Sequence, residues 1–176
     1  MRRLSGWTAA ATATALLIGW GCQRKPEQTV MVDDETRPAL SVLNVGHPRA
    51  DSQLLSGFYG VEEHSWRWTQ GKFAVALQPP PEAAKGVRLD LQFALPESLM
   101  SRRKAVTISA NVAGTALPPE IYTRAGDYTY SRDVPSEALA KPPIKVVFAI
   151  DQPLKAGEVE PRELGLVAKS VGFSGK

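Results

Sequence analysis

Disulfide bonds cannot stabilise this chain, because its 176 residues include one cysteine, Cys22. The fold must therefore rest on an ordinary hydrophobic core. The longest apolar run, residues 7–20, is shorter than the roughly 20 residues that a membrane-spanning helix needs. Excess charge is missing too: once Arg2 and Arg3 are set aside, 19 basic residues stand against 18 acidic ones. This balance argues against a nucleic-acid partner.

The N-terminus is typical of a secretory signal. Arg2 and Arg3 precede the apolar run, and the small residue Gly21 stands where a signal peptidase would cut. We therefore expect export, with residues 1–21 removed and a mature chain of about 155 residues, the length of a single domain. Because the one thiol, Cys22, directly follows the expected cut, we interpret it as a lipid attachment point.

Residues 16–22 resemble a bacterial lipoprotein signal, whose lipobox ends in a small residue and the modified cysteine. The chain departs from that pattern at Gly19 and Trp20, where the family prefers leucine and a small residue. Ordinary cleavage that leaves Cys22 as a free thiol is the alternative. Gln23 occupies the position where aspartate would retain an enteric-type lipoprotein in the inner membrane. The resemblance therefore implies a lipid anchor in the cell envelope, at the outer membrane, with the membrane as a partner.

The mature chain divides into a polar segment and a domain. Residues 22–50 are rich in charge and are expected to form a flexible tether, although the run 39–45 could add an edge strand. Residues 51–176 are expected to form the folded domain. Its clearest strand is 87–95, where five apolar side chains alternate with polar or small ones and so share one face.

Repeated short strands define the expected fold class. Besides 87–95, the same alternation predicts strands at 73–77, 106–112, 128–134, 144–150 and 166–173. The chain also holds 14 glycines and 14 prolines, which favour turns over long helices. An all-β, antiparallel β-sandwich is therefore expected. One helical turn is expected at 135–140, with Ser136 as its cap.

One segment, residues 57–69, differs from the rest of the chain. It holds both tryptophans of the mature protein, one of its two histidines and an adjacent pair of glutamates. On a strand, Trp66 and Trp68 point to the same side, and Arg67 points to the other. Two flat rings on one face could form a stacking platform for sugar rings, with Glu and Arg bonding the hydroxyls. The candidate ligand-binding residues are therefore Tyr59, Glu63, Trp66, Arg67 and Trp68.

A purely structural role is the alternative for this segment. Aromatic side chains usually serve packing, so Trp66 or Trp68 could close one end of the sandwich. Arg67 would then pair with Glu63 and hold the loop in place.

Residues 55–62 and 66–69 are similar to the opening of an unnamed β-sandwich module found in bacterial glycosyltransferases and polysaccharide-related proteins. Residues 160–165 match its closing Asp-x-Arg-x-Leu-Gly step, with Glu160 where aspartate is usual, and residues 126–130 resemble its central aromatic strand. The resemblance covers about residues 54–174. It implies a jelly-roll-like sandwich with a carbohydrate connection. The residues that carry its structural motif here are Gly57, Arg162, Leu164 and Gly165.

The chain after Cys22 holds no recognisable catalytic constellation. Glu62 and Glu63 are adjacent and would face opposite ways on a strand, so they are poorly placed as the acid and base of a glycosidase. His47 and His64 lack the partners and spacing of a zinc site. Residues 101–104 form a basic cluster, read as a solvated turn, with contact to anionic glycan or lipid headgroups as the alternative. No enzyme activity, metal or cofactor is expected.

Two functions follow as expectations. The first is a lipid-anchored envelope domain that acts as a non-catalytic carbohydrate-binding or accessory module. The second is a structural or assembly lipoprotein that contacts an envelope protein through a sheet edge or through the loop with the tryptophans.

Overall fold

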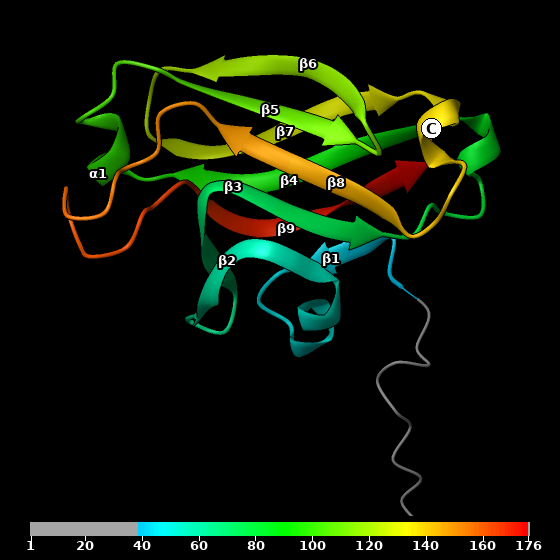
Figure 1. Ribbon diagram of the computed structural model, residues 1–176, viewed down its shortest axis with the longest axis horizontal. Coiled ribbons are helices and arrows are strands. Elements are labelled where there is room, and N and C mark those ends of the chain that lie inside the picture. The colour runs from blue at the N-terminus through cyan, green and yellow to red at the C-terminus, as the bar shows by residue number, and fades with distance from the viewer. Residues whose placement is uncertain (1–38, 176) are drawn as a thin grey trace, which may run out of the picture. The chain divides into compact units, whose positions relative to one another are not determined.

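The computed structural model describes residues 39–175 (Figure 1). Cys22, the signal segment 1–21 and the tether up to residue 38 lie outside the described residues, so the expectations about them stay predictions. The strands are β1 (Val42–Asn44), β2 (Leu54–Glu62), β3 (Trp66–Leu77), β4 (Val87–Leu95), β5 (Val106–Val112), β6 (Thr115–Tyr122), β7 (Gly126–Val134), β8 (Ile144–Ile150) and β9 (Val167–Gly175). The short helices are η2 (Pro48–Gln53), η3 (Ala83–Lys85), α1 (Glu97–Met100) and η4 (Ser136–Leu139).

Alternating burial confirms the strand predictions. In β4 every second residue from Val87 to Leu95 is buried, and the residues between them are exposed or half-buried. β5 and β8 follow the same rule, with their apolar side chains turned toward one core. The apolar faces of these three strands supply much of that core, since alternation puts one complete face out of water.

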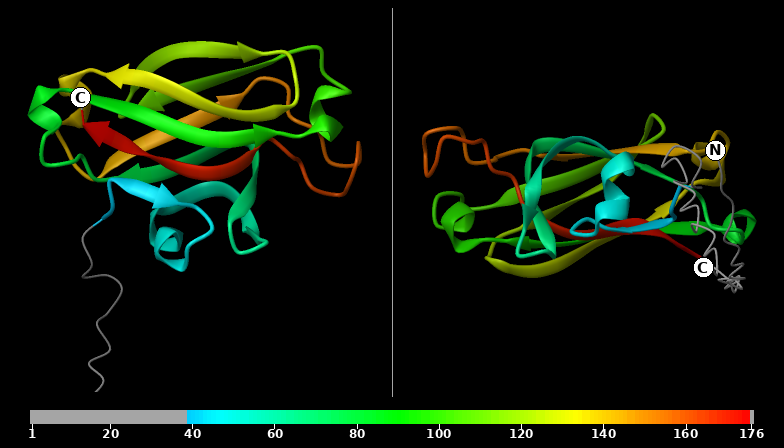
Figure 2. Two further views of the ribbon diagram at one scale, coloured as in Figure 1. Left: turned by 180° about the vertical axis from the view of Figure 1, so that it is seen from behind. Right: turned by 90° about the horizontal axis from the view of Figure 1, so that it is seen from below.

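The strands form an antiparallel sheet that folds over into two layers (Figures 1 and 2). Hydrogen-bonded neighbours follow the order β6-β5-β8-β3-β9-β4-β7. β3 joins the layers, because residues 72–77 pair with β8 whereas residues 67–68 pair with β9. The predicted antiparallel β-sandwich is therefore confirmed, and its two layers share one strand.

The first elements cover one open side of the sandwich. β1 pairs with β9, and β2 pairs with β3, so both lie off the main strand order (Figure 2). Leu43, Val45 and Ala50 are buried, so the packed part of the chain begins ahead of residue 51. The buried Gln53 side chain donates to the carbonyl oxygens of Ala76 at 2.6 Å and Leu40 at 3.1 Å, which fixes the end of η2 to β3.

Several elements differ from the sequence expectations, among them β6 and the helical turn near residue 136. β6 was not predicted, because Pro118 and Pro119 interrupt its pattern; proline is tolerated here because β6 is the last strand of its layer. The helical turn near residue 136 is present as η4, but Pro135 occupies the N-cap and makes no side-chain cap bond. The prediction that Ser136 caps this turn was therefore wrong.

Side chains connect the two terminal strands, β6 and β7. The Tyr130 hydroxyl donates to the Pro118 carbonyl oxygen at 2.8 Å. Arg132 donates to the carbonyl oxygens of Pro118 at 2.8 Å and Pro119 at 3.2 Å, and pairs with Glu120 at 2.8 Å. We call these contacts the β6–β7 seam. Because Pro118 and Pro119 have no backbone N–H groups to pair with a neighbouring strand, side chains make these contacts instead. The seam nearly closes the sheet.

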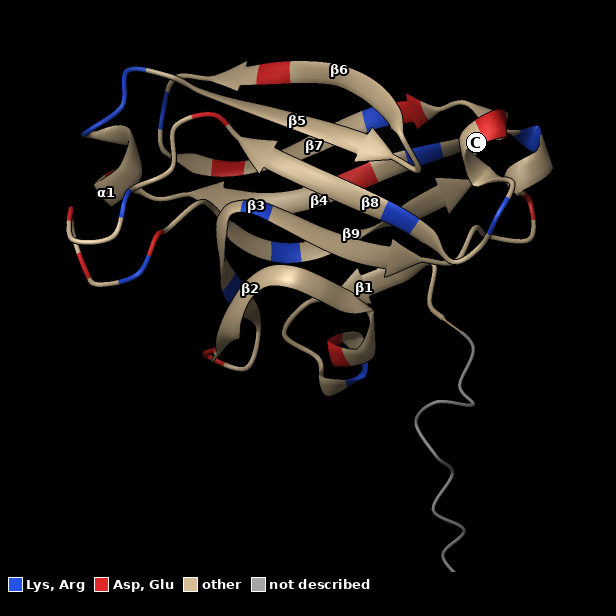
Figure 3. Cartoon of the chain, viewed as in Figure 1, with Lys and Arg blue, Asp and Glu red and all other residues tan. Residues whose placement is uncertain are grey.

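Basic and acidic residues are interspersed along the strands and loops (Figure 3). Within residues 39–175, no helix is long and apolar enough to cross a membrane.

Candidate functional site

The β2–β3 hairpin carries the segment singled out in the sequence. Its turn is closed by a hydrogen bond from the Ser65 N–H to the Glu62 carbonyl at 3.1 Å. Glu63 and His64 occupy the middle of the turn with φ of 48° and 55°, a left-handed conformation that is uncommon for residues other than glycine. The turn places Glu62 directly opposite Trp66. Directly opposed residues share a face, so Glu62 lies on the side of the two tryptophans.

Trp66 and Trp68 form a corner. Both are half-buried, their ring centres are 6.4 Å apart, and their planes meet at 79°. Trp68 also packs against the hydrophobic core. The rings share one face of β3, as the period of two predicts, and they stand nearly perpendicular to each other. One ring can stack on a sugar while the other forms a wall beside it.

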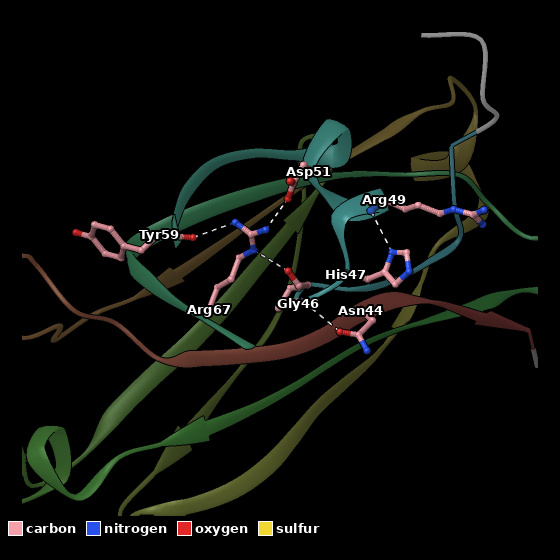
Figure 4. A network of polar contacts seen from close by, with 8 residues as sticks. Asn44, Gly46, His47, Arg49, Asp51, Tyr59 and Arg67 are labelled. Carbon is pink, nitrogen blue, oxygen red and sulfur yellow. Dashed lines mark hydrogen bonds and ion pairs between the residues drawn. The ribbon is translucent and has the colours of Figure 1, made fainter. Parts of the chain in front are cut away.

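By the alternation of β3, Arg67 lies on the face opposite to the two tryptophans, where it serves the framework. Figure 4 shows its contacts. Its guanidinium donates to the carbonyl oxygens of Val45 at 2.6 Å and Tyr59 at 3.1 Å, and pairs with Asp51 at 2.5 Å. The expected structural partner, Glu63, is exposed in the turn. Arg67 therefore fastens β1, η2 and β2 to β3 and leaves the tryptophan face to other polar groups.

Arg162 and Tyr59 bring the two ends of the sequence motif together. The Arg162 guanidinium lies 4.8 Å from the centre of the Tyr59 ring, and the Tyr59 hydroxyl donates to the Glu163 carbonyl at 2.8 Å. Arg162 also pairs with Glu62 at 3.6 Å and hydrogen-bonds Glu160. That hydrogen bond lowers the pKa of Glu160 and raises the pKa of Arg162. The charged groups beside the tryptophans are thus paired with one another.

The remaining motif residues have structural roles. At Gly57, where φ is +76°, an added Cβ would lie 2.2 Å from the Lys72 carbonyl oxygen. At Gly165 it would lie 2.5 Å from the Gln70 carbonyl. Leu164 is buried and pairs with Leu154 across a β-bridge. Gly57 therefore lets β2 lie close against β3, whereas Leu164 and Gly165 hold the 151–166 loop in place.

Thr69 secures the same junction from β3. Its buried hydroxyl donates to the Leu166 carbonyl at 3.2 Å and accepts from the Leu166 N–H at 3.1 Å. The site therefore rests on the point where β3 passes from one layer to the other.

Three charged residues beside the tryptophans were not among the ligand-binding residues predicted from the sequence. Arg162 was predicted only as a motif residue, and Glu62 and Glu160 were not predicted as ligand-binding residues. The resemblance to the β-sandwich module pointed to residues 55–62 and 160–165, but it did not show that the two segments lie next to each other. His47 lies at the N-cap of η2, where its Nδ1 accepts from the Arg49 N–H. Among the described residues, no group of three His, Cys, Asp or Glu side chains could hold a metal ion.

The basic cluster 101–104 is only partly a solvated turn. Arg103 is half-buried and donates to the Pro153 carbonyl at 3.0 Å and to Glu158 at 2.6 Å. The hydrogen bond from Arg103 lowers the pKa of Glu158. This arginine therefore fixes the 151–166 loop to the turn after α1.

No protein-family profile matches the chain, and no curated protein matches it. Among solved structures, the chain is similar to a family GH115 4-O-methyl-α-glucuronidase with specificity for decorated arabinogalactans. The sequence identity is 12%, the TM-score is 0.45, and the match covers 80% of this chain and 18% of that chain. The chain thus spans less than a fifth of that enzyme's length, and a likeness this loose carries no argument about shared function.

Proposed function

We propose that this chain is a lipid-anchored cell-envelope protein whose β-sandwich acts as a non-catalytic carbohydrate-binding module. The corner made by Trp66 and Trp68 carries the proposal. Aromatic ring faces bind the apolar face of a sugar, and polar groups at the rim orient its hydroxyls. Glu62 and Arg162 stand on the same side and supply such groups.

The fixed surroundings of the corner support this function. Trp68 is held by the core, and Arg162 is held by Tyr59, Glu62 and Glu160. A site whose side chains are already ordered loses less conformational entropy when it binds a ligand.

A glycan array tests the carbohydrate proposal directly. The full-length chain should bind a subset of immobilised polysaccharides, and Trp66→Ala should reduce that binding at least about tenfold, the loss expected for one stacking contact. Trp66 is the better first target, because Trp68→Ala also removes core packing. Ile121→Ala, which truncates an apolar side chain that is 66% exposed on β6, is the matched control. Circular dichroism must show an intact sheet in each variant. The absence of binding to every polysaccharide by an intact fold would sink the proposal.

The lipid anchor and the absence of catalysis are separate parts of the proposal. Labelled fatty acid should enter the wild-type chain in bacterial cells and should not enter Cys22→Ala. Equal labelling of the two chains would refute the anchor. Release of reducing sugar from a bound polysaccharide by the purified chain would refute the non-catalytic role.

A protein partner is the second candidate function, and it is favoured by an exposed edge. Among residues 39–175, β2 pairs with β3 alone, and it exposes two large apolar side chains, Leu55 at 48% and Val61 at 44%. Exposed apolar side chains on an edge strand are suited to pairing with another chain. A photo-crosslinker at Leu55 in cells should then trap one specific protein, whereas a crosslinker at Trp66 should trap glycan if the first proposal holds.

A further inference from the structure

A row of side chains extends from the tryptophan corner across the second layer. Trp68 is paired with Val167 of β9, Val167 with Ala94 of β4, and Ala94 with Asp127 of β7. We call these four residues the outer row; each is half-buried or exposed. The neighbouring row holds the buried Ala168, so it faces the core. Because adjacent strands lie about 4.8 Å apart, the outer row spans about 14 Å.

A β-bulge in β9 directs the side chain of Lys169 over this face. Gln92 pairs with Ser170 and Phe93 with Ala168, so Lys169 is an extra residue between them. Its ammonium group reaches across β4 to Asp127 at 2.6 Å. A shallow groove of about 240 Å³ lies here. The residues that line it are Gln92, Phe93, Asp127, Tyr128, Thr129 and Lys169.

The groove presents groups that suit sugar hydroxyls. Gln92 and Thr129 are directly opposed and exposed, so the amide and the hydroxyl share one face. Neither side chain is hydrogen-bonded to another group among residues 39–175. An amide and a hydroxyl can each donate and accept, which matches the dual capacity of a sugar hydroxyl.

The charges along this path favour an uncharged ligand. Lys169 is paired with Asp127 at the groove, and Arg162 lies against Glu62 and Glu160 at the corner. Each of these cations is already matched by at least one carboxylate. An acidic sugar would therefore meet carboxylates at the corner and at the groove, where Arg162 and Lys169 are already paired, so repulsion would weaken its binding.

We propose that the site binds an internal stretch of an uncharged polysaccharide, with one ring at the Trp66–Trp68 corner and the following units along the outer row to the groove. This inference rests on the proposed carbohydrate-binding function and extends it, because the corner alone would hold a single sugar unit. The Gln92–Thr129 pair is a second, distinct set of contacts that only a chain of several units reaches.

Calorimetric titration of the full-length chain with gluco-, galacto- and manno-oligosaccharides of one to six units tests the inference. For the sugar series that binds, affinity should rise with length until the groove is reached and then level off. Gln92→Ala combined with Thr129→Val should lower the affinity for the long members about tenfold, the effect of two neutral hydrogen bonds, and leave the affinity for the single unit unchanged. Gln152→Ala combined with Thr107→Val, outside the groove and the corner, is the matched control.

The outcomes separate this inference from the proposed function. Binding that does not depend on length, or that is unaffected by the Gln92 and Thr129 changes, would overturn the extended site and leave the corner as the binding site. Tighter binding of uronic-acid oligosaccharides than of neutral ones would overturn the uncharged ligand. Failure of every series to bind would refute the carbohydrate function and the extension together.

Discussion

At Gly57 the left-handed backbone brings the chain against β3, and this single position fixes how β2 lies. The φ angle of Gly114 is also positive, at +95°, but no atom lies within 4 Å of a Cβ added there. We expect Gly114→Ala to cost about 1–2 kcal/mol of unfolding free energy from the backbone alone. Gly57→Ala should cost about 1–3 kcal/mol more, because its Cβ would meet the Lys72 carbonyl. Urea unfolding of both variants checks this, and equal losses would show that β2 can move away.

Arg67 gives a second test at the scale of one residue. Arg67→Met should lower the unfolding free energy by about 2–4 kcal/mol, because the carbonyl oxygens of Val45 and Tyr59 lose their donor. Asp51→Asn should cost less than about 1 kcal/mol, since the Asp51 side chain is 61% exposed. Chemical denaturation measures both. A loss in Asp51→Asn as large as that in Arg67→Met would mean that the ion pair, and not the carbonyl bonds, fastens β1, η2 and β2 to β3.

The sequence predicted the face of each tryptophan but not the partners around it. A period of two is local, so Trp66 and Trp68 had to share a side and Arg67 had to oppose them. The partners of Arg67 depend on the register of β2, which shifts at three places along β3. Arg162 lies about a hundred positions from Tyr59, and alternation says nothing about contacts at such a separation.

The β6–β7 seam is the element-scale feature most open to test. Arg132→Ala removes the donor to the Pro119 carbonyl and one of the two donors to the Pro118 carbonyl, the other being the Tyr130 hydroxyl. We therefore expect β6 to open more often while the rest of the sandwich stays closed. Hydrogen exchange measured by mass spectrometry should show lost protection in residues 115–122 and unchanged protection in β4. Arg88→Ala, whose ion pair with Asp133 is exposed and 3.4 Å long, is the control and should change little. Equal loss of protection in β4 and β6 would show that the seam contributes to global stability instead.

Strand prediction succeeded where burial on one face controls the sequence. β4, β5 and β8 each turn one face to the core, which forces alternation. β6 and β1 are edge elements, so fewer of their side chains must be apolar and their patterns are weaker. The single turn of α1 is too short for helical periodicity and was not predicted.

At the scale of the whole molecule, a single strand joins the two layers. The sequence specified an antiparallel sandwich but not the strand order, because pairing between distant strands is set by packing and loop paths. β3 contacts β8 with one half and β9 with the other, and the candidate site lies at the half that meets β9. A substitution of Thr69 should therefore disturb both the candidate site and the packing of the two layers against each other.

The placement of β1 has a mechanical consequence. β1 runs antiparallel to β9, and Val42 at its start pairs with Gly172 near the end of the chain. A pull applied between residue 39 and residue 175 therefore loads the ladder from one end, and its bonds break one at a time. In optical tweezers we expect a first, low-force extension as β1 peels away, followed by cooperative rupture of the sandwich at higher force; one single rupture would contradict this. If the N-terminal side is tethered to a membrane and the site holds a polysaccharide, β1 is a compliant link that absorbs strain while the binding face stays folded.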